Sequence, residues 1–129
     1  MQLEHIVLVE DDADIQEIAK LALSSIGNFS VKICSSGSEA LQLLQDFKPQ
    51  LILLDVMMPN MDGPTVLEKI KKNPSLADLP VIFMTAKVQP EEIKSYLQMG
   101  ACGVISKPFN PLSLSETIQK IWEEHHKNS

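Results

Sequence analysis

The sequence predicts a doubly wound α/β domain, in which helices cover both faces of one parallel β-sheet. Two observations support this fold class. Short apolar runs with the length of buried strands recur along the chain, and stretches with helical periodicity separate them. Because each connection is long enough for a helix, the strands are expected to be parallel with right-handed crossovers. The strand-like runs are at residues 6–9, 31–34, 51–54, 81–84 and 104–105.

The helices are predicted from apolar residues spaced three or four positions apart. In the first helix these residues lie between positions 15 and 26 and form one stripe, and Gly27-Asn28 can end it because both residues tolerate a left-handed conformation. No break in composition separates the five β–α units, so we predict a single domain over residues 1–129 with a frayed tail at about 124–129. The later stripes run from Ala40 to Phe47, Val66 to Ile70, Ile93 to Leu97 and Leu114 to Trp122.

Composition narrows the classes of function. The 129 residues suffice for one core without a disulfide or metal, and the net charge of −6 disfavours binding to nucleic acid or to anionic lipid. Cys34 and Cys102 lie in apolar stretches and are predicted to be buried free thiols. The apolar runs are too short to span a membrane, and the N-terminus has no secretory pattern. These features predict a cytoplasmic protein.

Polar side chains follow four of the five predicted strands. Parallel strands of a doubly wound sheet place their carboxyl ends, and hence ligands, at one edge. Three carboxylates that converge there would repel one another unless a cation joined them, and Mg²⁺ prefers such oxygen ligands. With a hydroxyl and a lysine added, the set suits transfer of a phosphoryl group to an aspartate. The residues at these strand ends are Glu10, Asp11 and Asp12, then Asp55, Thr85 and Lys107.

Each of these residues also has a purely structural interpretation. Asp12 can be the N-cap of the first helix, and Glu10 and Asp11 can be favourable charges at its N-terminus. Asp55 can belong to a turn, and Lys107 can be an ordinary surface lysine. The joint placement at the ends of successive strands favours the functional interpretation.

Four segments carry a resemblance to a known family. Val9-Glu10-Asp11-Asp12, the segment 53–59 with Asp62-Gly63, Met84-Thr85-Ala86 and Lys107-Pro108-Phe109 resemble the receiver domain of bacterial two-component response regulators. The likeness covers essentially the whole chain in order and spacing, and it leads us to expect a stand-alone receiver of the chemotaxis-regulator type. It implies a flavodoxin-like (βα)5 fold with strand order 2-1-3-4-5.

The resemblance also implies the reaction and its metal. Asp55 would accept a phosphoryl group from a phosphohistidine on a sensor kinase or phosphotransfer protein, and the protein would assist its own phosphorylation and dephosphorylation. Asp11 would bind Mg²⁺ directly, with Glu10 beside it and with Asp55 and the backbone carbonyl of Met57 as further ligands; Mn²⁺ would substitute for Mg²⁺. Thr85 and Lys107 would contact phosphoryl oxygens, with a cis bond between Lys107 and Pro108.

One position departs from the family. Receivers usually carry Tyr or Phe three residues before the lysine, where this chain has Val104. Valine is short and stiff and cannot make the inward swing of an aromatic ring. We therefore expect Thr85 and the loop from Lys87 to Pro90 to carry the conformational switch.

The resemblance implies that the output is a change in protein binding. The expected surface is the fourth helix, fifth strand and fifth helix, from about Pro90 to Trp122, on a monomer or weak dimer. No direct contact with nucleic acid or membrane is expected.

Three alternatives stay open at this point. A hydrolase that forms an aspartyl phosphate usually has a second Asp two residues after the nucleophile, where this chain has Met57. An interaction module that works without phosphorylation would not need the full set of site residues. The chain can also be a piece of a longer regulator.

Overall fold

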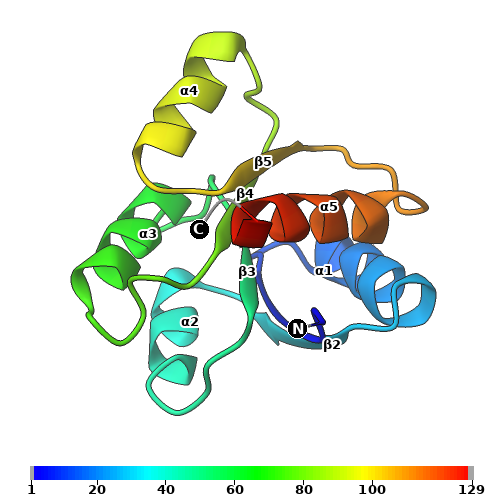
Figure 1. Ribbon diagram of the computed structural model, residues 1–129, viewed down its shortest axis with the longest axis horizontal. Helices are drawn as coiled ribbons and strands as arrows, with labels where there is room; N and C mark the ends of the chain where they lie inside the picture. Colours follow the sequence, from blue (N-terminus) through cyan, green and yellow to red (C-terminus); the bar gives the residue numbers. More distant parts are fainter. Residues whose placement is uncertain (1, 128–129) are drawn as a thin grey trace.

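The computed structural model describes residues 2–127 and contains one five-stranded parallel sheet (Figure 1). Its order is β2-β1-β3-β4-β5, so the predicted fold class and strand order are confirmed. After β1 the chain forms β2 at one edge of the sheet. The strands β3, β4 and β5 then follow one another on the other side of β1. The strands are β1 His5–Val9, β2 Ser30–Cys34, β3 Leu51–Asp55, β4 Val81–Thr85 and β5 Gly103–Ser106.

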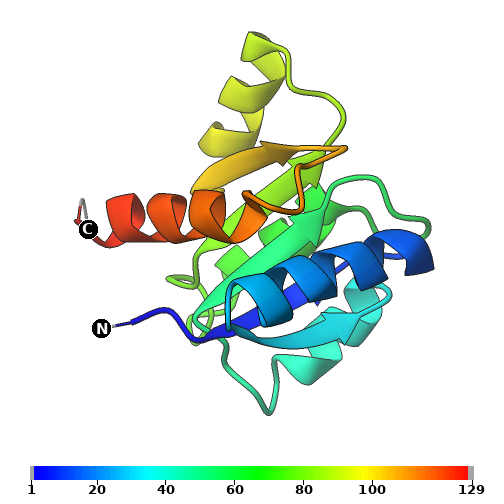
Figure 2. The same ribbon diagram turned by 90° about the vertical axis from the view of Figure 1, so that its right-hand side faces the viewer.

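Helices cover the two faces of the sheet (Figures 1 and 2). Buried side chains of α2, α3 and α4 pack on one face, and those of α1 and α5 pack on the other. Every residue of β3 and β4 is buried, because helices cover both faces of these two strands, and this explains their continuous apolar runs. The helices are α1 Ala13–Lys20, the π-helical turn η1 Leu21–Ile26, α2 Gly37–Leu43, α3 Gly63–Lys72, α4 Pro90–Gln98 and α5 Leu114–Lys127.

The first helix differs from its predicted single stripe. It continues into η1, where the Gly27 N–H donates to the Ala22 carbonyl five residues earlier at 3.1 Å, and the Ser115 hydroxyl donates to the same carbonyl at 2.7 Å. The wider turn shifts the phase of the residues that follow it. Ile26 is therefore 51% exposed, and Ile18, which lies at the edge of the stripe, is 45% exposed. The prediction that both lie on the buried face was wrong.

Gly27 is required by the packing of this turn. A Cβ built at Gly27 would lie 2.2 Å from the Ser115 hydroxyl oxygen and 2.9 Å from the Leu23 carbonyl oxygen. We expect Gly27→Ala to lower the free energy of unfolding by about 1–3 kcal/mol, as overpacking does elsewhere. Urea unfolding measures the change. Ser25→Ala, at an exposed position of the same turn, is the control and should stay within about 0.5 kcal/mol; equal stability of all three proteins would contradict this account.

Both cysteines are free thiols as predicted, but only Cys34 is buried, whereas Cys102 is partly exposed; burial raises the pKa of each to about 11. Within residues 2–127, no helix has the length and apolar character needed to cross a membrane. Helix α5 continues to Lys127, and the rest of the tail that was predicted to fray lies outside the described residues.

Candidate functional site

The carboxyl ends of β1, β3, β4 and β5 meet at one edge of the sheet. Glu10 follows β1, Asp55 and Thr85 end β3 and β4, and Lys107 follows β5. Parallel pairing brings these positions level with one another, with Asp55 opposite Met84 and Thr85 opposite Ser106. The structure therefore places the predicted side chains at the expected edge of the sheet.

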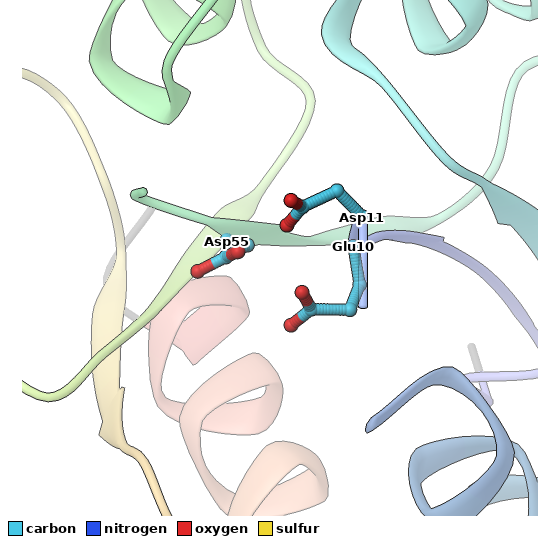
Figure 3. A group of neighbouring side chains, drawn as sticks. All are labelled: Glu10, Asp11 and Asp55. Atoms are coloured by element: carbon cyan, nitrogen blue, oxygen red, sulfur yellow. The ribbon is translucent and has the colours of Figure 1, made fainter. Parts of the chain in front are cut away.

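Three carboxyl groups lie side by side at this edge (Figure 3). Glu10 and Asp55 are buried, with 0% and 2% of their surface exposed, whereas Asp11 is exposed. One carboxylate oxygen from each residue lies within 4.8 Å of the other two. Two buried acids at this distance concentrate negative charge at the edge of an apolar sheet, which is unfavourable without a compensating cation.

The Lys107 ammonium provides part of that compensation. Its Nζ lies 2.9 Å from Oε1 of Glu10 and 3.1 Å from Oδ1 of Asp55, and only 18% of its side chain is exposed. The Lys107–Pro108 peptide bond is cis, as expected. One cation thus bridges two acids that are 45 positions apart in the sequence: Glu10, which follows β1, and Asp55, which ends the adjacent strand β3.

The pKa values show that the compensation is incomplete. Burial raises the pKa of Glu10 to about 7, and the charge of Asp55 adds to the rise, against the lowering effect of Lys107 and of the Asp12 N–H. Burial on its own would lower the pKa of Lys107, but its hydrogen bonds to Glu10 and Asp55 raise it overall. The site holds its lysine charged and still favours additional positive charge.

A divalent cation fits this donor set. The residues offer carboxylate oxygens with no sulfur or imidazole nitrogen among them, which suits a hard ion such as Mg²⁺ and not Zn²⁺ or copper. Three carboxylates within 4.8 Å of one another share a single ammonium, which contacts two of them, so negative charge is left for a divalent cation to neutralise. Glu10, Asp11 and Asp55 are the residues that would hold the ion.

The turn after β1 is fixed by hydrogen bonds to its backbone. Asp12 is the N-cap of α1, since its carboxylate accepts from the N–H groups of Asp14 and Ile15. The Asp12 N–H donates to Oε2 of Glu10 at 3.1 Å. The side-chain amide of Gln16 donates to the Glu10 carbonyl. The structural interpretation of Asp12 is therefore confirmed, and Gln16 is a site neighbour that the sequence analysis missed.

The loop after β3 lies close against Asp55. A Cβ at Gly63 would come within 2.5 Å of the Asp55 carbonyl oxygen, so only glycine allows α3 to begin this near the site. The Gly63 N–H donates to the Val56 carbonyl at 2.9 Å. The backbone nitrogen of Met57 lies 3.4 Å from Oδ1 of Asp55, and the Met57 side chain is 63% exposed.

Thr85 and Val104 lie on the strands that lead to α4 and α5. The buried Thr85 hydroxyl oxygen accepts a hydrogen bond from the Lys87 N–H at 3.0 Å, which ties it to the loop before α4. Val104 is partly buried and packs against the cluster that contains Phe83 and Tyr96, whose rings meet edge to face at 5.2 Å.

Comparison with known proteins assigns this architecture to a family. Residues 6–119 match the family described as "Response regulator receiver domain". A probable transcriptional regulator ycf29 of Porphyra purpurea is 40% identical over 126 residues, covering 97% of this chain and 59% of that protein. The response regulator Rre1 of Synechocystis is 31% identical over 125 residues, covering 96% and 54% respectively. The chain thus spans about half the length of the curated relatives it matches.

Solved structures show the same fold. The chemotaxis response regulator CheY4 of Vibrio cholerae superposes with a TM-score of 0.86 at 27% identity, covering 93% of this chain and 99% of that one. A CheY-like receiver domain protein of Methanospirillum hungatei superposes with a TM-score of 0.83 at 30% identity, covering 99% and 100%. The resemblance drawn from the four sequence segments is confirmed, and the chain belongs to the response regulator receiver domain family.

Proposed function

We propose that this domain accepts a phosphoryl group on Asp55 in a Mg²⁺-dependent reaction and signals by changing its affinity for a protein partner. The donor is a phosphohistidine on a sensor kinase or on a phosphotransfer protein. The observation that carries the proposal is the position of Asp55: it is a buried carboxylate with an ammonium 3.1 Å away and two further acids beside it.

The chemistry follows from these neighbours. A carboxylate oxygen of Asp55 attacks phosphorus, the P–N bond to the donor imidazole breaks, and the product is an acyl phosphate. Lys107 is already within hydrogen-bond distance of Asp55 and neutralises charge on the arriving phosphoryl oxygens. The Thr85 hydroxyl donates to another of these oxygens. Mg²⁺, held by Glu10, Asp11, Asp55 and the Met57 carbonyl, supplies further charge stabilisation when bound.

The residue two positions after Asp55 favours a signalling acceptor over a hydrolase. Met57 carries a thioether, which has no proton to give to a leaving group, and its side chain points to solvent. The acyl phosphate is therefore left to hydrolyse with attack by water, assisted only by the groups that formed it. This gives the signal a finite lifetime.

Incubation with acetyl phosphate tests the proposal without a partner protein. We expect intact-protein mass spectrometry to show one added phosphoryl group per chain when Mg²⁺ is present, and none when EDTA is present. The modification should be lost at alkaline pH, as an acyl phosphate is. Equal labelling with and without Mg²⁺, or a base-stable product, would overturn the proposal.

The contact between Thr85 and Lys87 supports the proposed switch. A hydroxyl accepts and donates at once, so Thr85 can keep the Lys87 N–H while it turns toward a phosphoryl oxygen. Movement of Thr85 would then draw the loop from Lys87 to Pro90 toward the site and shift α4, with Val104 too short to take the aromatic role. Structures with and without a bound phosphate mimic should differ in this loop, and an unmoved loop would contradict the switch.

An apolar groove beside the site supports the proposed donor. Ile15 and Ile18 of α1 form one wall, and Pro108, Phe109 and Pro111 form the other, with Lys107 also lining it. Because Lys107 contacts both Asp55 and this groove, a helix docked here would place its histidine close to the acceptor. We propose that the donor protein binds in this groove, in the cytoplasm, and that the face formed by α4, β5 and α5 contacts the downstream protein. For this acidic domain, as a monomer or weak dimer, we propose no contact with nucleic acid or membrane.

The Ile18→Glu variant tests whether the donor protein binds in the groove without changing the chemistry at Asp55. The assay uses the kinase that phosphorylates the wild-type protein fastest. We expect phosphotransfer from this kinase to Ile18→Glu to be slower by about tenfold or more, because the variant places a charge in an apolar contact. Labelling by acetyl phosphate should be unchanged. Leu97→Glu, at a similarly exposed apolar position on α4, is the matched control and should keep the wild-type rate. Equal slowing by both variants, or by neither, would contradict the assignment of the groove.

A further inference from the structure

We propose that Gln16 is a positioning residue that fixes the Glu10–Asp11 peptide and thereby sets the affinity of the acidic cluster for Mg²⁺. The inference rests on the proposed function, because it concerns the metal that this function requires. Gln16 itself makes no contact with Asp55 or Lys107 among the described interactions.

The geometry shows a bridge between two loops. Nε2 of Gln16 donates to the Glu10 carbonyl and also to the Ser35 hydroxyl, at 3.2 Å for the latter. A single amide nitrogen has two N–H groups, so one side chain serves both acceptors. Ser35 follows β2 and Glu10 follows β1, so the amide joins the two strand ends just beyond their last paired residues, Val9 and Cys34.

The hydrogen bond from Gln16 pairs the last polar group of Glu10. The Glu10 N–H already donates to the Cys34 carbonyl at 3.0 Å, and its carboxylate is held by the Asp12 N–H and by Lys107. The carbonyl is the one remaining polar group of this residue, and Gln16 holds it. The carbonyl and the following N–H belong to the same planar peptide, so its orientation sets the direction in which the Asp11 side chain leaves the chain.

Asp11 depends on this constraint more than its neighbours do. Among residues 2–127, its exposed side chain makes no hydrogen bond or ion pair, in contrast to Glu10 and Asp55. No side-chain partner holds it near the other two carboxylates, so the direction of its backbone limits where it can lie. A metal ligand that must first be ordered binds more weakly, because the ordering entropy is lost on binding.

The position of Gln16 in α1 suits this task. Its N–H donates to the Asp12 carbonyl, so it stands one turn into the helix. Side chains of a helix point back toward its N-terminus, and a glutamine from this turn reaches past the cap to the end of β1. A methionine there would keep the length and the helix preference but would donate nothing.

Gln16→Met tests the proposal with a readout that does not depend on phosphorylation. Mg²⁺ is titrated into the unphosphorylated protein while the amide NMR signals of residues 10–12 are followed. We expect the Kd for Mg²⁺ to rise about 3- to 10-fold, the range that one neutral hydrogen bond supports. In the metal-free protein, hydrogen exchange at the Asp11 amide should become faster. Ser35→Ala, which removes only the far acceptor, should give a smaller increase in Kd.

The rate of labelling at different Mg²⁺ concentrations distinguishes a positioning role of Gln16 from a catalytic one. At saturating Mg²⁺ the Gln16→Met protein should be labelled by acetyl phosphate at the wild-type maximal rate, with only the half-saturating Mg²⁺ concentration raised. Gln98→Met, at an exposed position at the end of α4, is the matched control and should change neither quantity. A wild-type Kd in Gln16→Met, or a lower melting temperature with unchanged Kd, overturns the inference and leaves the proposed function standing. Absence of Mg²⁺ binding to the wild-type protein overturns both.

Discussion

The Asp55→Asn protein is expected to take up no phosphoryl group from acetyl phosphate or from a kinase, at any Mg²⁺ concentration. A carboxamide has nearly the shape of the carboxylate but is not a nucleophile, so the acceptor is lost while the packing is kept. Phosphoryl incorporation is measured by intact-protein mass spectrometry after equal incubation of variant and wild type. Asp46→Asn, at an exposed position outside the site, is the control and should be labelled like the wild-type protein.

The same variant should remain folded, which keeps the experiment interpretable. Lys107 retains Glu10 as its ion-pair partner at 2.9 Å, and the repulsion between Asp55 and Glu10 is removed. We therefore expect a cooperative unfolding transition and wild-type far-UV circular dichroism. Labelling of the folded Asp55→Asn protein at the wild-type level would show that another residue is the acceptor.

Lys107→Met is expected to have the second largest effect, on both stability and phosphorylation. It leaves two buried carboxylates without their ammonium partner, which costs about 3 kcal/mol of unfolding free energy at pH 8 in metal-free buffer. It also removes a cation from the charge that develops during transfer, so labelling at saturating Mg²⁺ should slow by about 10²-fold or more. Urea unfolding in EDTA and the rate of labelling measure the two effects.

The loss of stability in this variant should depend on pH in a defined direction. In the wild-type protein the pKa of Glu10 is about 7 in the folded state, above the value of 4.5 for a free side chain. Folding therefore becomes less favourable as the pH rises through this interval, and the full cost of an ionised Glu10 is present above about pH 7. Lys107 lowers the pKa of Glu10, so the free-energy cost of ionising Glu10 in the folded state is larger when Lys107 is removed.

The difference in unfolding free energy between Lys107→Met and wild type should therefore be greater at pH 8 than at pH 5, where Glu10 is protonated in both proteins. Lys94→Met, which removes an exposed lysine from α4, should change neither the stability nor its dependence on pH. A Lys107→Met protein as stable as wild type at pH 8 would show that the two acids do not depend on this lysine.

Much of the fold follows from local patterns in the sequence. The runs that became β3 and β4 are apolar at every position because both of their faces are covered, and this alone predicts a central parallel strand. The site residues Glu10, Asp55 and Thr85 could be placed because each comes at or just after the end of such a run. The order of the strands and the cis bond after Lys107 came from the family resemblance.

Contacts between distant segments could not be predicted. The Ser115 hydroxyl contacts the Ala22 carbonyl of the π-helical turn from 93 positions away, and Ile26 at the end of this turn is exposed. The ion pair between Lys107 and Glu10 joins residues 97 positions apart. Gln16 has a polar side chain on a helix with no motif of its own, so its bridge is visible only once β1 and β2 are side by side.

Chemical identification of the acceptor is the most direct test of the account. An acyl phosphate on aspartate is reduced by borohydride to homoserine, so the modified position can be read by peptide mass spectrometry. After incubation with acetyl phosphate and Mg²⁺, we expect homoserine at position 55 and at no other aspartate, and none when EDTA replaces Mg²⁺. Homoserine at another position, or a phosphoryl group that borohydride leaves in place on a serine, threonine or histidine, would contradict the account.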